Sequence, residues 1–270
     1  MGGSERLAIL GTGNIGRAMA VGLVASGRYV ADQIILTRRN LDQISDLADR
    51  GFVTQSDNRD AVRRAEVVMV AVEPLQLDGL LAEIRDTLEP GRHLLISVVS
   101  GADLAALSKG VGKRLDLVRA MPNTAIALCQ SMTCLALNSA DDQVRRRAVE
   151  IFEAVGLTVV IEEELMVPAT ALCACGIAFF LRAIRSASQG GIEIGFHPGD
   201  ALTMAAQTAL GAASLVLTQG THPEREIDAV TTPRGCTIAG LNEMEHQGFS
   251  SALIKGIVTS AAKAASLYPG

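Results

Sequence analysis

Residues Leu7–Gly16, LAILGTGNIG, decide the fold of this 270-residue chain, because an apolar strand runs directly into a glycine-rich turn. The turn has the spacing G-x-G-x-x-G, and an amphipathic run, Ile15–Ala25, follows it. In such a turn Gly11 makes the sharp bend, Gly13 lets the main chain approach a pyrophosphate, and Gly16 lets the helix pack closely on its strand. The phosphates then lie at a helix N-terminus, where free N–H groups favour negative charge. The stretch therefore predicts a dinucleotide-binding domain.

Apolar strands and helices alternate after this turn as far as residue 161. Further strands are expected at Gln33–Thr37, Phe52–Thr54, Glu66–Val72, His93–Val99, Leu115–Arg119, Met132–Leu137 and Thr158–Ile161. Repeated βα units of this length favour a mostly parallel, doubly wound sheet with right-handed crossovers. The sequence therefore predicts an α/β fold that begins with a Rossmann domain at residues 1–163.

The character of the chain changes after Glu164, because no strand-like alternation returns. Helices are expected at Pro168–Gly190, Pro198–Gln219, Thr237–Gln247 and Phe249–Leu267, with a loop at Gly220–Thr232. These helices are rich in alanine and only weakly amphipathic, so a small domain cannot cover all of them. We therefore expect residues 164–270 to form an all-α dimerisation domain in a homo-oligomer built from dimers.

One uncharged run, Leu165–Leu181, tests whether a membrane is involved. A membrane-spanning helix needs about 20 predominantly apolar residues, and this run is shorter and is interrupted by Pro168 and Gly176. A helix that is apolar all round is otherwise buried in a core or an oligomer interface. We interpret the run as an interface helix, with no membrane partner.

Composition restricts the remaining partners. The formal net charge of −5 and the pI of about 5.4 argue against nucleic acid or an anionic membrane surface. The five cysteines form no disulfide framework, and the four histidines lack the spacing of a metal site. The first residues, MGGSER, lack the apolar core of a signal peptide. We expect a cytoplasmic protein with reduced thiols and no metal.

The predicted cofactor site collects residues from the carboxyl ends of the strands, where ligands bind in such sheets. Its expected members are Gly11, Thr12, Gly13, Asn14, Ile15, Thr37, Arg38, Arg39, Asn58, Val72, Glu73, Pro74, Ser100, Pro122 and Asn123. An NAD site usually has an acidic residue after the second strand, whereas this chain has Thr37-Arg38-Arg39. A hydroxyl and two guanidinium groups suit a 2′-phosphate, so NADP is expected, with NADPH preferred over NADH. The alternative is a pair of solvated arginines.

The segment Asp228–Leu241, DAVTTPRGCTIAGL, resembles the C-terminal motif D-x-V-[ST]-[ST]-P-G-G-x-T-I-x-G-L of the pyrroline-5-carboxylate reductases. Arg119–Thr124, RAMPNT, is similar to that family's R-x-M-P-N-T, and Pro198–Gly211 is similar to its helix with A-x-Q-T-x-x-G. The resemblance runs over nearly the whole chain. It implies reduction of a small cyclic imine, Δ1-pyrroline-5-carboxylate, to L-proline by hydride transfer from NAD(P)H, the last step of proline biosynthesis.

The same resemblance implies where the substrate binds. Pro233, Gly235, Cys236 and Thr237 match the family's substrate loop, and Thr237 matches its catalytic threonine, whose hydroxyl contacts the ring nitrogen as an orienting group or proton donor. A loop that ends at the start of a helix also presents free N–H groups to a carboxylate. The alternative for Thr237 is an ordinary helix N-cap.

Four positions depart from the family pattern. Glu73 stands where the family usually has lysine, Arg234 replaces a glycine of the substrate loop, Ile177 replaces a proline, and Gly220 stands where an acidic residue is common. These changes leave two alternatives open: an NADPH-dependent reductase of a related imine or keto substrate, or a catalytically weak, NADP-binding regulatory dimer.

Overall fold

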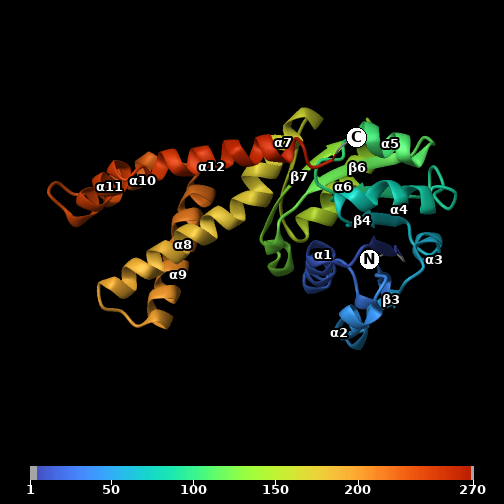
Figure 1. Ribbon diagram of the computed structural model, residues 1–270, viewed down its shortest axis with the longest axis horizontal. Coiled ribbons are helices and arrows are strands. Elements are labelled where there is room, and N and C mark those ends of the chain that lie inside the picture. Colours follow the sequence, from blue (N-terminus) through green and yellow to red (C-terminus); the bar gives the residue numbers. More distant parts are fainter. Residues whose placement is uncertain (1–4, 269–270) are drawn as a thin grey trace. The chain divides into compact units, whose positions relative to one another are not determined.

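The computed structural model describes residues 5–268, which divide into two compact units (Figure 1). The sheet unit is the described part of Met1–Cys175 together with the C-terminal segment that begins at Ser260. The helical unit is Gly176–Thr259. The chain therefore passes between the units twice.

The sheet unit is built on one eight-stranded sheet with the order β3-β2-β1-β4-β5-β6-β7-β8. Its strands are β1 (Leu7–Leu10), β2 (Ile34–Thr37), β3 (Val53–Gln55), β4 (Val67–Val70), β5 (Leu94–Ser97), β6 (Asp116–Met121), β7 (Ser131–Leu137) and β8 (Gly156–Val160). The direction in which strands are added reverses at β1, which lies between β2 and β4. This arrangement confirms the predicted Rossmann-like sheet, and ligands bind such sheets beside the reversal point.

One pair of strands breaks the parallel pattern, because β6 and β7 run antiparallel while the other neighbouring strands among residues 5–268 are parallel. The connection between them, residues 122–130, contains only the short 3-10 helix η4 (Thr124–Leu128). A parallel pair needs a crossover of about a dozen residues or more. The short connection therefore returns the chain in the opposite direction.

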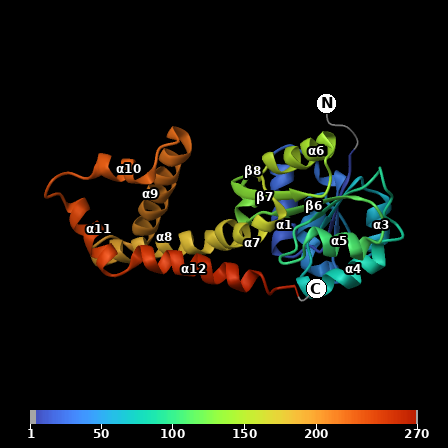
Figure 2. The ribbon, with the colours of Figure 1, turned by 90° about the horizontal axis from the view of Figure 1, so that it is seen from above.

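Helices cover both faces of the sheet. Because successive strand residues point to opposite faces, Leu7 and Ile9 of β1 enter one core, while Ala8 and Leu10 enter the other. The first core includes α1, α2 and α6, and the second includes α3, α4 and α5; Figure 2 shows α6 and α4 on opposite sides of the sheet. These helices are α1 (Asn14–Ala25), α2 (Ser45–Asp49), α3 (Asn58–Arg63), α4 (Leu77–Ile84), α5 (Leu104–Val111) and α6 (Asp142–Glu153).

The rest of the chain is helical. After β8 come α7 (Met166–Ala169) and a π-helical segment, η6 (Thr170–Cys175), both in the sheet unit. The next helices are α8 (Gly176–Glu193), α9 (Pro198–Gln219), α10 (Pro223–Val230), α11 (Cys236–His246) and α12 (Phe249–Ala264). The last residues of α12, from Ser260 onward, belong to the sheet unit. An all-α region therefore follows the sheet, as predicted.

Two details of the helix prediction were wrong. Residues 220–232, expected as a loop, contain α10, whose start has Pro223 at its first position and Glu224 in its first turn. Both features favour a helix N-terminus, so the sequence did carry the signal. In addition, the helix expected from Pro168 to Gly190 begins at Met166, includes the π-helical segment and continues to Glu193.

The predicted domain boundary at residues 163 and 164 stays a prediction. The compact units instead divide between Cys175 and Gly176, and the C-terminal segment packs with the sheet unit. There the hydroxyl of Tyr268 donates a 2.6 Å hydrogen bond to the carboxylate of Asp78 on α4. This bond raises the pKa of Tyr268 to about 12.

Candidate active site

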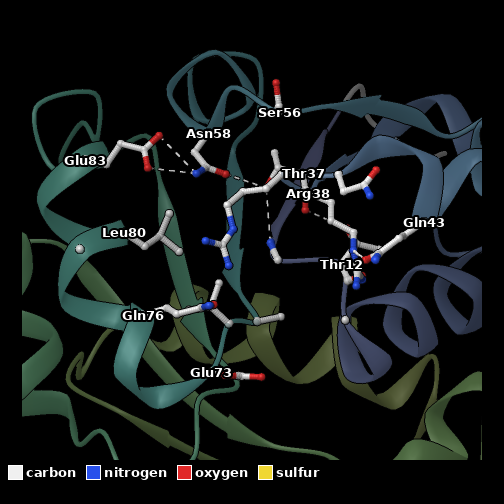
Figure 3. A pocket seen from close by; sticks show the side chains of 17 residues that line it. Thr12, Thr37, Arg38, Gln43, Ser56, Asn58, Glu73, Gln76, Leu80 and Glu83 are labelled. Carbon is white, nitrogen blue, oxygen red and sulfur yellow. Dashed lines mark hydrogen bonds between the residues drawn. The ribbon is translucent and has the colours of Figure 1, made fainter.

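A pocket of about 520 Å³ lies at the carboxyl ends of β1, β2 and β4 in the sheet unit (Figure 3). It is lined by the glycine turn, the residues after β2 and β4, the start of α3 and one face of α4. The predicted cofactor residues that the pocket brings together are Gly11, Thr12, Gly13, Thr37, Arg38, Arg39, Asn58, Val72 and Glu73. Most of the residues predicted from scattered segments therefore line one cavity.

The other predicted cofactor residues do not line this pocket. Asn14 and Ile15 begin α1, Pro74 begins a short 3-10 helix, and Ser100 follows β5. Pro122 and Asn123 follow β6, where the side-chain oxygen of Asn123 accepts a hydrogen bond from the backbone N–H of Ala125. Their contact with a cofactor stays a prediction.

Sequence reasoning missed a second group of lining residues. They are Asn40, Gln43, Ser56, Ala71, Gln76, Gly79, Leu80 and Glu83. Gln76, Gly79, Leu80 and Glu83 recur at intervals of three and four, which places them on one face of a helix. The spacing was readable, but none of these residue types marks a phosphate or adenine site by itself.

The three glycines of the opening turn differ in what surrounds them. Gly11 has a φ of +95°, and a Cβ added there would lie 2.7 Å from the carbonyl oxygen of Ala71. A Cβ on Gly16 would lie 2.4 Å from the carbonyl oxygen of Gly11. A Cβ on Gly13 would meet no protein atom within 4 Å. Gly11 and Gly16 are therefore required by the fold, whereas the space at Gly13 is open to a ligand.

A chain of hydrogen bonds joins three elements along one wall of the pocket. The hydroxyl of Thr37 donates to the side-chain oxygen of Asn58 at 2.6 Å and accepts from the backbone N–H of Gly11 at 3.3 Å. The side-chain nitrogen of Asn58 in turn donates to both carboxylate oxygens of Glu83 on α4, at 3.2 and 3.1 Å. Figure 3 shows Thr37, Asn58 and Glu83 in this succession. The Thr37 hydroxyl proton is therefore already engaged within the protein.

The two arginines after β2 are used differently. The guanidinium of Arg38 donates to the carbonyl oxygen of Thr12 through Nη1 and to Oε1 of Gln43 through Nε, the latter at 2.8 Å. The guanidinium of Arg39 makes no hydrogen bond with the described residues, although Arg39 lines the same pocket. Arg38 therefore fixes the glycine turn to the segment after β2, and Arg39 keeps its donors free for a ligand.

The pocket fits a dinucleotide phosphate by the chemistry of its donors. The open space at Gly13 lies beside the N-terminus of α1, where backbone N–H groups favour a pyrophosphate. The guanidinium of Arg39 also lines the pocket, and it is a cation of the kind that binds phosphate groups. The carboxylate of Glu83 accepts both of its hydrogen bonds from the Asn58 amide, which fixes its position on one wall of the pocket.

The predicted substrate residues lie in the helical unit. Pro233 and Arg234 precede α11, which begins at Cys236 with Gly235 as its N-cap. Thr237 is in the first turn, partly exposed, and its hydroxyl makes no hydrogen bond with the described residues. Thr237 is therefore not the N-cap, which removes the alternative structural reason for its hydroxyl.

Arg234 departs from the family pattern in its backbone as well as its side chain. Its φ is +59°, a left-handed conformation that glycine adopts without strain and other residues seldom adopt. Its side chain is exposed. At Arg234 the loop therefore has a backbone conformation that suits the glycine of the family pattern, and it carries an additional guanidinium.

Comparison with known proteins decides the family. Residues 163–267 match the pyrroline-5-carboxylate reductase dimerisation family, and residues 6–101 match the family described as NADP oxidoreductase coenzyme F420-dependent. Pyrroline-5-carboxylate reductase 2 of Dictyostelium discoideum is 47% identical over 276 residues, which cover 96% of this chain and 92% of that protein. This chain belongs to the pyrroline-5-carboxylate reductase family. The predicted family, the fold and the assignment to NADP-linked oxidoreductases are thereby confirmed.

Two further relatives show how far the likeness extends. Pyrroline-5-carboxylate reductase 1 of Dictyostelium discoideum is 56% identical over 97% of this chain, but the chain spans only half the length of that protein. The solved pyrroline-5-carboxylate reductase of Coxiella burnetii has a TM-score of 0.88 and 29% identity, and the match covers 98% of this chain and 99% of that one.

A second solved structure supports the fold alone. The Plasmodium falciparum pyrroline carboxylate reductase with NADP bound has a TM-score of 0.89 at 22% identity, over 98% of each chain. Members of the pyrroline-5-carboxylate reductase family thus share this fold at low sequence identity.

Proposed function

We propose that this chain reduces Δ1-pyrroline-5-carboxylate to L-proline with NADPH as the hydride donor. The observation that carries the proposal is the hydroxyl of Thr237, which lies at the start of α11 without a protein hydrogen-bond partner in the described chain. Family membership supplies the substrate class, since the relatives are named for this reductase activity.

Each group of residues has a separate task in this reaction. Bound NADPH supplies the hydride, which goes to the imine carbon. The backbone N–H groups at the N-terminus of α11 bind the substrate carboxylate. The hydroxyl of Thr237 contacts the ring nitrogen and orients the imine, which as a protonated C=N bond is already a good electrophile. Because the cofactor carries the difficult chemistry, positioning is the main contribution of the protein.

The cofactor preference is part of the proposal. Arg39 provides a guanidinium with free donors in the pocket, and bidentate arginine contacts suit phosphate oxygens. We therefore propose that NADPH is preferred over NADH.

The direct test is turnover. Purified protein should oxidise NADPH on addition of Δ1-pyrroline-5-carboxylate, and a six-membered cyclic imine carboxylate should be reduced more slowly. Faster reduction of the larger imine would favour the alternative substrate. No turnover with intact NADPH binding would favour the regulatory dimer and contradict the proposal.

The role of Thr237 is tested by two substitutions. Thr237→Ala should lower kcat/KM for the imine by tenfold or more, on the order of 1.4 kcal/mol, with the NADPH dissociation constant unchanged. Thr237→Ser keeps the hydroxyl and should retain most of the activity. Equal activity of the alanine variant and the parent would exclude this role.

We also propose that the chain acts as a homodimer in the cytoplasm. Large apolar side chains stand exposed on α8, α9 and α12, among them Phe180, Leu210, Leu217 and Val258. Monomeric proteins seldom leave such surfaces uncovered, and all four positions fall within the matched dimerisation region. Light scattering should give twice the monomer mass, and a monomer at assay concentration would contradict the dimer.

Membrane insertion is the competing explanation for these apolar helices. By length and composition, residues 163–193 and Pro198–Gln219 could each cross a membrane. Such a finding is weak for one or two helices, and we propose that partner helices cover them. Sedimentation of the expressed protein with the membrane fraction would contradict both the dimer interface and the cytoplasmic location.

A further inference from the structure

Two thiols face each other in a small apolar cluster of the sheet unit, outside the pocket. Cys134 is buried on β7 and Cys173 is half-buried in the π-helical segment η6. Their sulfur atoms lie 3.8 Å apart. Met121, Ala136, Met166 and Ala169 form the rest of the buried cluster. All five cysteines lie within residues 5–268, and among them only Cys134 and Cys173 have their sulfur atoms in hydrogen-bond contact with each other.

We propose that Cys134 and Cys173 are an oxidation site, at which a hydroperoxide converts the two thiols to an intrachain disulfide that lowers turnover. The sulfur atoms must approach from 3.8 Å to about 2.05 Å. Cys134 is held by its strand, where it pairs with Met121 of β6. The adjustment therefore falls on the π-helical segment.

The two thiols are unequal, which assigns their roles. A hydrogen bond joins the two sulfur atoms, and this contact with Cys134 lowers the pKa of Cys173. The same contact, together with burial, raises the pKa of Cys134. The thiolate is the form that attacks an oxidant. Cys173, which is also the more accessible of the two, is therefore the attacking thiol, and Cys134 resolves the product.

The oxidation proceeds in two steps. The thiolate of Cys173 attacks one oxygen of a hydroperoxide, forming a sulfenic acid as the O–O bond breaks and hydroxide or alkoxide leaves. The sulfur of Cys134 then attacks the sulfenic sulfur, and water leaves with the thiol proton of Cys134. With hydrogen peroxide, two thiols are oxidised and one peroxide is reduced to two waters once the hydroxide is protonated.

A hydrogen bond links this pair to the residues after β6. The side-chain nitrogen of Asn123 donates to the carbonyl oxygen of Cys173 at 3.3 Å. Asn123 belongs to the predicted cofactor residues, and its other side-chain atom caps η4. Movement of Cys173 toward β7 therefore disturbs Asn123. This part of the inference rests on the proposed reductase function, whereas the disulfide itself does not.

The covalent test uses mass spectrometry on the full chain. Reduced protein is treated with one equivalent of hydrogen peroxide, alkylated and digested with trypsin without reduction. Oxidation should remove two free thiols per chain and join the peptides of residues 120–145 and 148–182, and dithiothreitol should separate them.

Serine variants assign the bond, because each peptide contains two cysteines. The link should be lost in Cys134→Ser and Cys173→Ser and retained in Cys129→Ser and Cys175→Ser. Cys134→Ala serves if the serine is not tolerated in the buried position. A link that persists without Cys134 or Cys173, or oxidation confined to the exposed Cys236, would overturn the proposal.

Turnover provides the second readout. Oxidised parent protein should reduce the imine at most half as fast as the reduced form, with recovery on addition of dithiothreitol, while Cys173→Ser should show no reversible loss. A disulfide that forms with unchanged turnover would overturn the regulatory part. If the chain reduces no imine, NADPH binding with and without peroxide replaces turnover, and unchanged binding would overturn that part.

Discussion

The hydroxyl of Thr37 donates a 2.6 Å hydrogen bond to the side chain of Asn58, which lies 21 residues later in the chain. The same hydroxyl accepts the backbone N–H of Gly11. The last residue of β2 therefore holds both the glycine turn and the start of α3. The Thr37 hydroxyl therefore has a structural role in addition to any contact that it makes with a cofactor.

Replacement of this hydroxyl should affect both stability and cofactor binding. Thr37→Val removes one donor and one acceptor at a buried position, which costs about 1–3 kcal/mol. We expect a lower free energy of unfolding and higher KM values for NADPH and NADH alike, measured by denaturation and steady-state kinetics. Thr37→Ser should behave like the parent. A valine variant that loses only NADPH binding would show that the hydroxyl contacts the 2′-phosphate instead.

Alanine substitutions of the two arginines after β2 should have different effects on the KM values for NADPH and NADH. Arg39→Ala should raise KM for NADPH about 10- to 100-fold with little change for NADH, because hydrogen bonds to charged groups contribute about 1.5–3 kcal/mol. Arg38→Ala should raise KM for both cofactors by similar factors, since its guanidinium holds the carbonyl oxygen of Thr12. If the two variants lost the preference for NADPH over NADH to the same extent, these separate roles of Arg38 and Arg39 would be contradicted.

Substitution by alanine should affect protein stability at Gly16 and cofactor binding at Gly13. Gly16→Ala should lower the free energy of unfolding by about 1–3 kcal/mol, because the new Cβ has no room beside Gly11. Gly13→Ala should leave thermal stability nearly unchanged and weaken NADPH binding, since its Cβ enters the open space of the pocket. Calorimetry and cofactor titration distinguish the effects. Unchanged binding by the Gly13 variant would mean that the phosphates lie elsewhere.

His93 should make stability depend on pH. Its Nδ1 accepts the backbone N–H of Glu89, its Nε2 contacts the carbonyl oxygen of Val62, and burial holds the pKa of His93 below its usual value of 6.5. The folded protein thus favours the neutral ring. Its stabilising effect is complete above about pH 6.5 and is lost as the pH falls through the lower folded-state pKa.

The pH dependence is measured by chemical denaturation between about pH 8 and pH 5. His93→Gln should be less stable at the higher pH and lose less stability on acidification. His246→Gln, at an exposed position of α11, is the matched control and should follow the parent. Identical pH profiles for the parent and the His93 variant would rule out this residue as the cause.

Much of the fold and of the cofactor site could be predicted because the signals are local. The strand before Gly11 and the glycine spacing lie in one short stretch of sequence, and the two arginines after β2 are adjacent to each other. What was missed depends on tertiary packing: the face of α4 that carries Glu83 has no distinguishing residue types. The antiparallel turn before β7 follows from a connection that is too short for a crossover.

The site details show the same division. Composition cannot tell that Arg38 is engaged and Arg39 free, because the difference lies in where Thr12 and Gln43 are placed by the fold. Cys134 and Cys173 are 39 residues apart, and only the packing of η6 beside β7 brings them together. The start of α11 at Cys236, by contrast, lies one residue before Thr237, where the sequence placed the helix start.

The return of the C-terminal segment to the sheet unit, with Tyr268 bonded to Asp78, affects how the helical unit unfolds. Residues 176–259 are anchored at both ends, so their local unfolding releases a closed loop instead of a free tail. A closed loop has fewer conformations, which reduces the entropy gained on melting. Tyr268→Phe should therefore increase hydrogen exchange throughout a helical region that contains neither partner of the lost bond.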